Sequence, residues 1–434
     1  MKLRNILQNL GANLLITLFG LVGSIILARW LGPSQRGIFA SIILIPTVLQ
    51  YFVNFGLFSA TIYFTAQPIS NKNTIWSNLL IVSFIQSIVG ILIGYFIISS
   101  YLQKYNAVII NLGYLYLLTV PLGLISMYAT YMLQGASYFK VTNLLKCIVP
   151  VGYCLSVIVL KYYQNLTIEN LVYVQIIIQS FYLIIALFLL YKILLKHFTF
   201  RIEYNFIRQM LAYSVKIWVG DVSQLANSRI DQFLIGGILS SKDLGIYTVA
   251  ISVARFTSVF ADAVKTIMLP SVTNKNSFQE KMAETLNFFK KYWIFSIFFH
   301  LIFILFLPFL VPFIFGNAYA EAVLICQILV VGSFFINAKT ILSGGVLGMG
   351  FPEMVSYVEV IGMIISSVLC FLMINLYGLT GVSIAIAISY SCQLIGLTYL
   401  MNNKGIIYRN VFNISWNEFK NDLNWFKNAI QYFK

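Results

Sequence analysis

Ionisable side chains lie inside two long apolar segments of this chain, where their types and spacing could form a binding site. In residues 211–238, polar and charged positions between Lys216 and Asp231 recur at helical spacing and fall on one arc of a helix. A second arc in residues 245–270 includes Arg255 and Lys265. An ionisable group at bilayer depth costs roughly 2.5–3.5 kcal/mol on insertion scales and usually faces a wet or paired interior. The pattern favours two walls of a water-filled cavity, with a salt-bridge cluster that only joins helices as the alternative.

Cations exceed anions among the charges inside the apolar segments. Arg29 and Arg36 add to this excess at one mouth of the expected cavity. Such a balance suits an anionic substrate, because the planar guanidinium of Arg offers a bidentate fork to phosphate. The candidate substrate-binding residues are Arg29, Lys216, Arg255, Lys265 and Lys339.

The carboxylates of the same segments are candidates for ion coupling or gating: Asp221, Asp231, Asp262 and Glu359. A buried carboxylate beside a cation can favour either protonation state, because desolvation raises its pKa and the cation lowers it. Asp262 is the preferred coupling residue, since it lies three residues before Lys265 on one helical face. Asp231 is expected to be a structural partner of Arg229 or of another basic residue.

The elements that must position these side chains are membrane-spanning helices. Hydrophobic residues make up 60% of the 434 residues and charged residues only 9%, whereas soluble proteins carry about 25% charged residues. A bilayer core about 30 Å thick needs roughly 20 apolar residues per helix. The sequence predicts an all-α polytopic membrane protein with spans at 9–29, 39–66, 78–100, 108–133, 143–160, 170–191, 211–238, 245–270, 286–312, 319–341, 354–375 and 380–401.

Several functional classes do not fit this composition. The loops are too short for a soluble catalytic domain, and the chain has no Gly-rich phosphate loop, HExxH or GxSxG motif, so an enzyme is not expected. Its five cysteines lack a CxxC pair, which argues against a metal site or a disulfide framework. The net charge of +15 reflects topology and not nucleic-acid binding, because Lys and Arg concentrate in the loops of one side. This bias predicts that both termini are cytoplasmic.

A weak internal repeat divides the chain into two halves. Leu31–Phe39 and Leu239–Tyr247 share Leu, Gly, Ile and an aromatic residue at a constant offset of 208 residues, although so short a match could also arise by chance. Two six-helix halves in the same orientation would bind substrate between them and alternate between inward and outward states. The predicted parts are an N-terminal lobe (1–192), a cytoplasmic linker (193–210), a C-terminal lobe (211–401) and an amphipathic interfacial helix (402–434).

Four motifs occur in order along the chain: Ile26–Pro33 with Arg36–Ala40, Arg229–Gly236 with Leu244–Tyr247, Ile314–Tyr319, and Leu376–Val382. They resemble those of Wzx-type flippases, the O-antigen and polysaccharide repeat-unit transporters of the multidrug/oligosaccharidyl-lipid/polysaccharide superfamily. The resemblance implies a V-shaped, MATE-like transporter of the bacterial inner membrane that works by alternating access. It would flip undecaprenyl-pyrophosphate-linked oligosaccharides of O-antigen, capsule or exopolysaccharide from the cytoplasmic to the outer leaflet.

The resemblance also bears on partners and on the alternatives. It implies a proton or a sodium ion as the coupling ion, no other cofactor, and a polymerase and a chain-length regulator as protein partners. An ion-coupled multidrug exporter of the same superfamily stays open, although the cationic excess argues against it. A polysaccharide polymerase or glycosyltransferase is the alternative of another class, but such proteins usually carry a large extracytoplasmic loop.

Overall fold

The computed structural model describes residues 3–67 and 71–405, and the regular secondary structure in these ranges is helical throughout. The first half folds into α1 (Leu3–Val53), α2 (Leu57–Ala66), α3 (Lys72–Tyr101), α4 (Ala107–Tyr116), α5 (Thr119–Gly135), α6 (Phe139–Tyr162) and α7 (Ile168–Ile193). The second half folds into α8 (Tyr204–Ile238), α9 (Ser241–Thr273), α10 (Phe278–Phe315), the 3-10 turn η1 (Asn317–Tyr319), α11 (Ala322–Met349) and α12 (Pro352–Asn403). The predicted interfacial helix 402–434 lies outside the described residues from position 406 onward.

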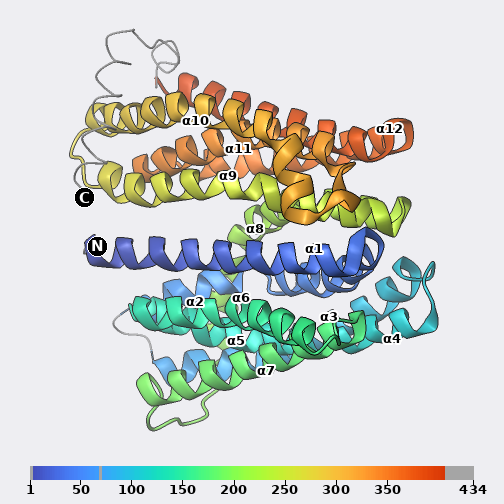
Figure 1. The fold of residues 1–434 in the computed structure, drawn as a ribbon. Helices are drawn as coiled ribbons and strands as arrows, with labels where there is room; N and C mark the ends of the chain where they lie inside the picture. Colours follow the sequence, from blue (N-terminus) through green and yellow to red (C-terminus); the bar gives the residue numbers. More distant parts are fainter. Residues whose placement is uncertain (1–2, 68–70, 406–434) are drawn as a thin grey trace.

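Two of these helices are too long to cross a bilayer once. A straight helix of the 51 residues of α1 would be about 76 Å long at 1.5 Å per residue. The chain instead reverses at Gly32 (φ 70°, ψ 174°), and α12 breaks in the same way at Gly378 (φ 55°, ψ −132°). Only glycine adopts such angles readily. Each of these helices therefore consists of two arms that cross separately (Figure 1).

The described helices give the twelve crossings that the sequence predicts. By length and hydropathy, nine helical segments could span a membrane, with α4 and α5 counted together as one segment. The second arms of α1 and α12 add two crossings, and the polar helix α8 adds another. The two arms of α1, with α2 completing the second, therefore match the predicted spans 9–29 and 39–66.

The helices form two lobes. Figure 1 shows α2–α7 on one side and α9–α12 on the other, with α1 running between them. The first lobe has one buried apolar cluster that includes Trp76 and Tyr128, and the second has two, around Tyr247 and Phe289. The all-α, two-lobed fold with twelve crossings is thus confirmed, while the predicted lobe boundaries at residues 192 and 211 stay predictions.

Candidate functional site

A cavity of about 570 Å³, here called the central cavity, lies between the two lobes. This volume is within the range of about 300–1,000 Å³ that is typical of small-molecule sites. The second arm of α1, which packs in the first lobe, lines one wall with α2 and α5, and helices α8 and α9 of the second lobe line the other. The lining residues are Thr47, Tyr51, Phe58, Ser59, Ile62, Tyr131, Asp221, Gln224, Leu225, Ser228, Arg229 and Arg255.

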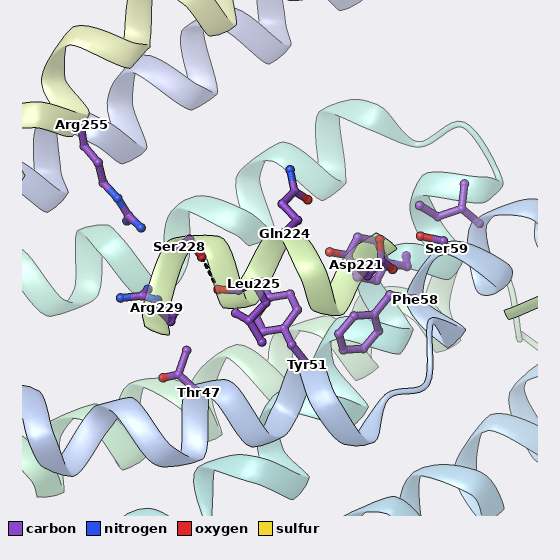
Figure 2. Close-up of a pocket in the computed structure, with 12 residues that line it drawn as sticks. Thr47, Tyr51, Phe58, Ser59, Asp221, Gln224, Leu225, Ser228, Arg229 and Arg255 are labelled. Atoms are coloured by element: carbon purple, nitrogen blue, oxygen red, sulfur yellow. Dashed lines mark hydrogen bonds between the residues drawn. The ribbon is translucent and has the colours of Figure 1, made fainter. Parts of the chain in front are cut away.

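The wall from the second lobe is charged. The helical spacing of α8 brings Asp221, Ser228 and Arg229 to this cavity, and Figure 2 shows Arg255 extending from α9 toward the α8 segment with Ser228 and Arg229. Arg255 is close enough to Arg229 that their charges repel each other. Arg229 donates a hydrogen bond to the amide oxygen of Gln232 at 3.2 Å. Two guanidinium groups held together beside a cavity form a site for an anion.

The wall from the first lobe is aromatic. Phe58 packs edge-to-face on Tyr51, with ring centroids 6.1 Å apart, and its ring centroid lies 5.2 Å from that of Tyr131. Thr47 and Ser59 place hydroxyl groups beside these rings. Aromatic rings and hydroxyl groups together suit a ligand that is apolar on one face and polar at its edges, because tyrosine combines an apolar body with a polar tip.

The lobes touch at the end of this cavity nearer the N-terminus. Trp218 of α8 donates its indole N–H to the backbone oxygen of Phe52 at 3.0 Å and packs on the ring of Phe55. Gly56 is in the left-handed region (φ 75°), and a Cβ there would overlap the Ser214 carbonyl oxygen. The α1–α2 turn therefore approaches the backbone of α8 closely.

A second cavity of about 540 Å³ lies between α8 and the first arm of α12. Its charged lining residues are Lys216, Asp221, Glu353 and Glu359. Asp221 lines both cavities. Glu359 is buried and forms an ion pair with Lys339, while Asn227 donates to its second carboxylate oxygen at 2.9 Å. This group joins α8, α11 and α12.

Comparison with known proteins decides the family. The family model described as "Polysaccharide biosynthesis protein" matches residues 26–324, well over half of the chain. The chain belongs to this family. A curated relative, the uncharacterized membrane protein MJ1375 of Methanocaldococcus jannaschii, is 26% identical over 403 residues, with 87% of this chain and 93% of the relative covered.

Two solved structures share the fold of this polysaccharide biosynthesis protein. The lipid II flippase MurJ in an inward closed conformation matches with a TM-score of 0.77 at 15% identity, covering 91% of this chain and 88% of the other. An inward-facing MATE-family multidrug resistance transporter of the MOP superfamily matches with a TM-score of 0.70 at 14% identity, covering 90% and 95%. The family and this fold confirm the recognition made from the sequence motifs.

The structure brings together only part of the predicted cationic site. Arg255 lines the central cavity, and Lys216 lines the second cavity. Lys339 is paired with Glu359, so its charge is already balanced. Lys265 is half-buried against α11, where a Cβ on Gly344 would lie 2.9 Å from its Cγ. Arg29 binds the backbone oxygens of Ile314 and Phe313 near the end of α10 and is absent from the lining of both cavities.

The predicted carboxylates also separate. Asp221 and Glu359 face cavities. Asp231 is buried and accepts hydrogen bonds from the Tyr247 hydroxyl and the Gln232 backbone N–H, both at 2.7 Å. The positive charges of Arg229 and Arg255 also act on its carboxylate. Asp262 is exposed and lines neither cavity.

Sequence reasoning left several cavity residues out of the site. In the sequence, Arg229 is one of the basic residues expected to pair with Asp231 and is not among the candidate substrate-binding residues, but its place beside Arg255 puts it on the cavity wall. The signal that could have found it is the repeated polar spacing of α8, because Asp221, Ser228 and Arg229 all lie on one side of that helix. The aromatic wall carried no such signal, since aromatic residues occur throughout this chain.

Proposed function

We propose that this protein flips undecaprenyl-pyrophosphate-linked oligosaccharide repeat units from the cytoplasmic to the outer leaflet of a bacterial inner membrane. The observation that carries the proposal is the central cavity, whose cationic wall and aromatic wall belong to different lobes. Arg229 and Arg255 bind the pyrophosphate, and Tyr51, Phe58 and Tyr131 contact the first sugars. A substrate held by both walls joins the lobes, which is how binding energy favours a closed intermediate between the two open states.

Charge supports a lipid-linked anion over a cationic drug. The central cavity has two guanidinium groups and one carboxylate, Asp221, among its lining residues. A cationic drug would be repelled by this balance, whereas a pyrophosphate gains charge-assisted hydrogen bonds. The glycan and headgroup cross through the cavity while the lipid chain stays in the bilayer.

Ion coupling belongs to the same proposal. Asp221 lines both cavities and is therefore the described carboxylate best placed to exchange a proton or a sodium ion with water as the lobes move. The sequence-based preference for Asp262 stays a prediction that the same experiment tests. A polymerase and a chain-length regulator as partners, and cytoplasmic termini, also stay predictions.

The test reconstitutes the purified protein in liposomes that contain a fluorescent undecaprenyl-pyrophosphate-linked oligosaccharide. A membrane-impermeant quencher should reach nearly all of the fluorophore when the protein is present and about half of it in protein-free liposomes. The double variant Arg229→Ala/Arg255→Ala should behave like protein-free liposomes. Arg201→Ala is the matched control, because that arginine is 64% exposed and pairs with Glu203 outside the cavity.

Two other outcomes would contradict the proposal. Lengthening of the glycan, seen on a gel, would indicate a polymerase, and uptake of a cationic dye without lipid flipping would indicate a drug exporter.

Proton and sodium gradients are then applied to the wild type, to Asp221→Asn and to Asp262→Asn. A wild-type gradient response in both variants would reject coupling through these carboxylates, and a wild-type flux that ignores every gradient would indicate passive flipping.

A further inference from the structure

We infer that the contact between Gly37 and Gly245 is the gate that closes the cavity at the end away from the N-terminus. This gate is built on the internal sequence repeat and is latched by Arg29, Arg36 and Lys104. The inference requires two lobes that move, but it does not depend on the identity of the transported molecule.

The contact is reciprocal across the repeat. A Cβ on Gly37 would overlap the carbonyl oxygen of Ser241, and a Cβ on Gly245 would overlap the carbonyl oxygen of Pro33. Positions 33 and 241, like 37 and 245, are 208 residues apart, which is the offset of the sequence repeat. Equivalent residues of the two halves thus face each other, so the pseudo-two-fold axis that relates the lobes passes through this contact.

The two glycines bring the backbones of α1 and α9 together at this contact. Small residues let two helix backbones approach closely, and at Gly37 and Gly245 the neighbouring atoms are backbone atoms of the other helix. Ala28 of α1 also packs with Leu244 in the buried apolar cluster of the second lobe. Backbone contacts of the Cα–H···O type are worth perhaps 0.5–1 kcal/mol each. The glycine contact is therefore close, and it adds little to the free energy that separation of α1 and α9 requires.

Arg36 forms hydrogen bonds both across this junction and within α1. Its buried guanidinium donates to the Ser24 backbone oxygen at 2.6 Å, to the Ser24 hydroxyl at 2.7 Å and to the Thr248 hydroxyl at 2.9 Å. Only the bond to Thr248 crosses to α9. The hydroxyl of Ser24 also donates across to Ser252, at 3.1 Å. When α1 and α9 separate, Arg36 keeps its two bonds to Ser24, so opening does not leave a buried charge without partners.

Two further cations clamp the lobes on either side of the glycine contact. Lys104, in the turn after α3, donates to the backbone oxygens of Leu239, at 2.9 Å, and Gly236 at the end of α8. Arg29 donates to the Ile314 oxygen, at 2.7 Å, and to the Phe313 oxygen near the end of α10. Both cations bind helix C-terminal carbonyls, where the helix dipole favours positive charge. Water can replace a carbonyl acceptor, so these clamps are reversible.

The first experiment measures opening by cysteine labelling in a cysteine-free background. Thr47→Cys places a reporter on the cavity wall, and Lys242→Cys marks the face of the membrane on which the gate lies. Gly37→Ala and Gly245→Ala should increase labelling of position 47 by an impermeant maleimide from the face that labels position 242. Gly20→Ala is the matched control, because a Cβ there has nothing within 4 Å. Folded Gly37 and Gly245 variants in which the labelling of position 47 is unchanged would overturn the gate.

A second experiment covers the case in which the glycine variants fail to fold. Ser24→Cys/Ser252→Cys replaces two hydroxyl groups that are 3.1 Å apart, so the two sulfur atoms can form a disulfide between α1 and α9. Oxidation should stop transport, and a reductant should restore it, while each single variant should ignore both reagents. Transport that continues with the pair fully crosslinked would show that this junction does not open.

Discussion

Two groups of charged residues in this protein differ in what balances their charge. Arg229 and Arg255 line the central cavity, where a ligand or water completes their hydrogen bonds. Lys339 and Glu359 balance each other inside the second lobe. The two groups look the same in the sequence, since each places an ionisable side chain in an apolar helix. They should nevertheless respond differently to mutation.

At the cavity, Arg255→Ala should abolish transport while protein abundance stays near normal, because an exposed side chain contributes little to folding. Arg255→Lys should restore only part of the flux, since an ammonium lacks the bidentate fork. The measurement is flipping per reconstituted protein, with Arg201→Ala as control. Full transport by Arg255→Ala would remove the main residue of the cationic wall.

For the buried pair, Lys339→Ala should lower the free energy of unfolding by about 3–5 kcal/mol, because it leaves the Glu359 carboxylate without its cation. The double variant Lys339→Met/Glu359→Gln should recover most of this stability, and thermal unfolding in detergent measures both. A double variant that is stable and flips normally would make the pair structural. If it is stable but has lost its gradient response, Glu359 has the coupling role that the sequence suggested.

At the scale of single elements, glycine decides where the long helices turn. Gly32 has a φ of 70° with open space around it, so a Cβ at this position is opposed by the backbone angle and not by a neighbouring atom. Gly32→Ala should therefore cost about 1–3 kcal/mol of stability, the usual range for such strained backbone. Gly20→Ala, in the regular part of α1, should be neutral or stabilising. Equal effects of the two substitutions on thermal unfolding would show that the reversal at Gly32 does not need glycine.

At the scale of the whole molecule, twelve crossings place alternate loops on opposite faces of the membrane. Single cysteines at positions 242 and 281 should therefore label from opposite sides, with position 281 on the cytoplasmic side that the distribution of Lys and Arg predicts. Impermeant maleimide applied to intact and to permeabilised cells makes the distinction. Labelling of both positions from one face would contradict the path of α9 from Ser241 to Thr273 across the membrane.

The amino-acid sequence by itself determined the class of fold and the number of crossings, and it predicted a two-fold repeat. Each depends on local properties, namely the length of an apolar run, the charge of the loops and a spacing along one chain. The motifs also identified the family, and the polar spacing of α8 and α9 predicted a charged wall that contains Arg255.

Only the tertiary structure decided which charges share a cavity. Arg29 and Arg229 are both arginines at or in an apolar span. Arg29 nevertheless binds the end of α10, whereas Arg229 faces the cavity. Lys339 and Glu359 are 20 residues apart on different helices, and only packing brings their charges together. The reason is physical: a helix face can be calculated from spacing, but which neighbour it meets depends on how the helices pack. The same holds for Gly37 and Gly245, where the sequence revealed the repeat and the fold made its two copies touch.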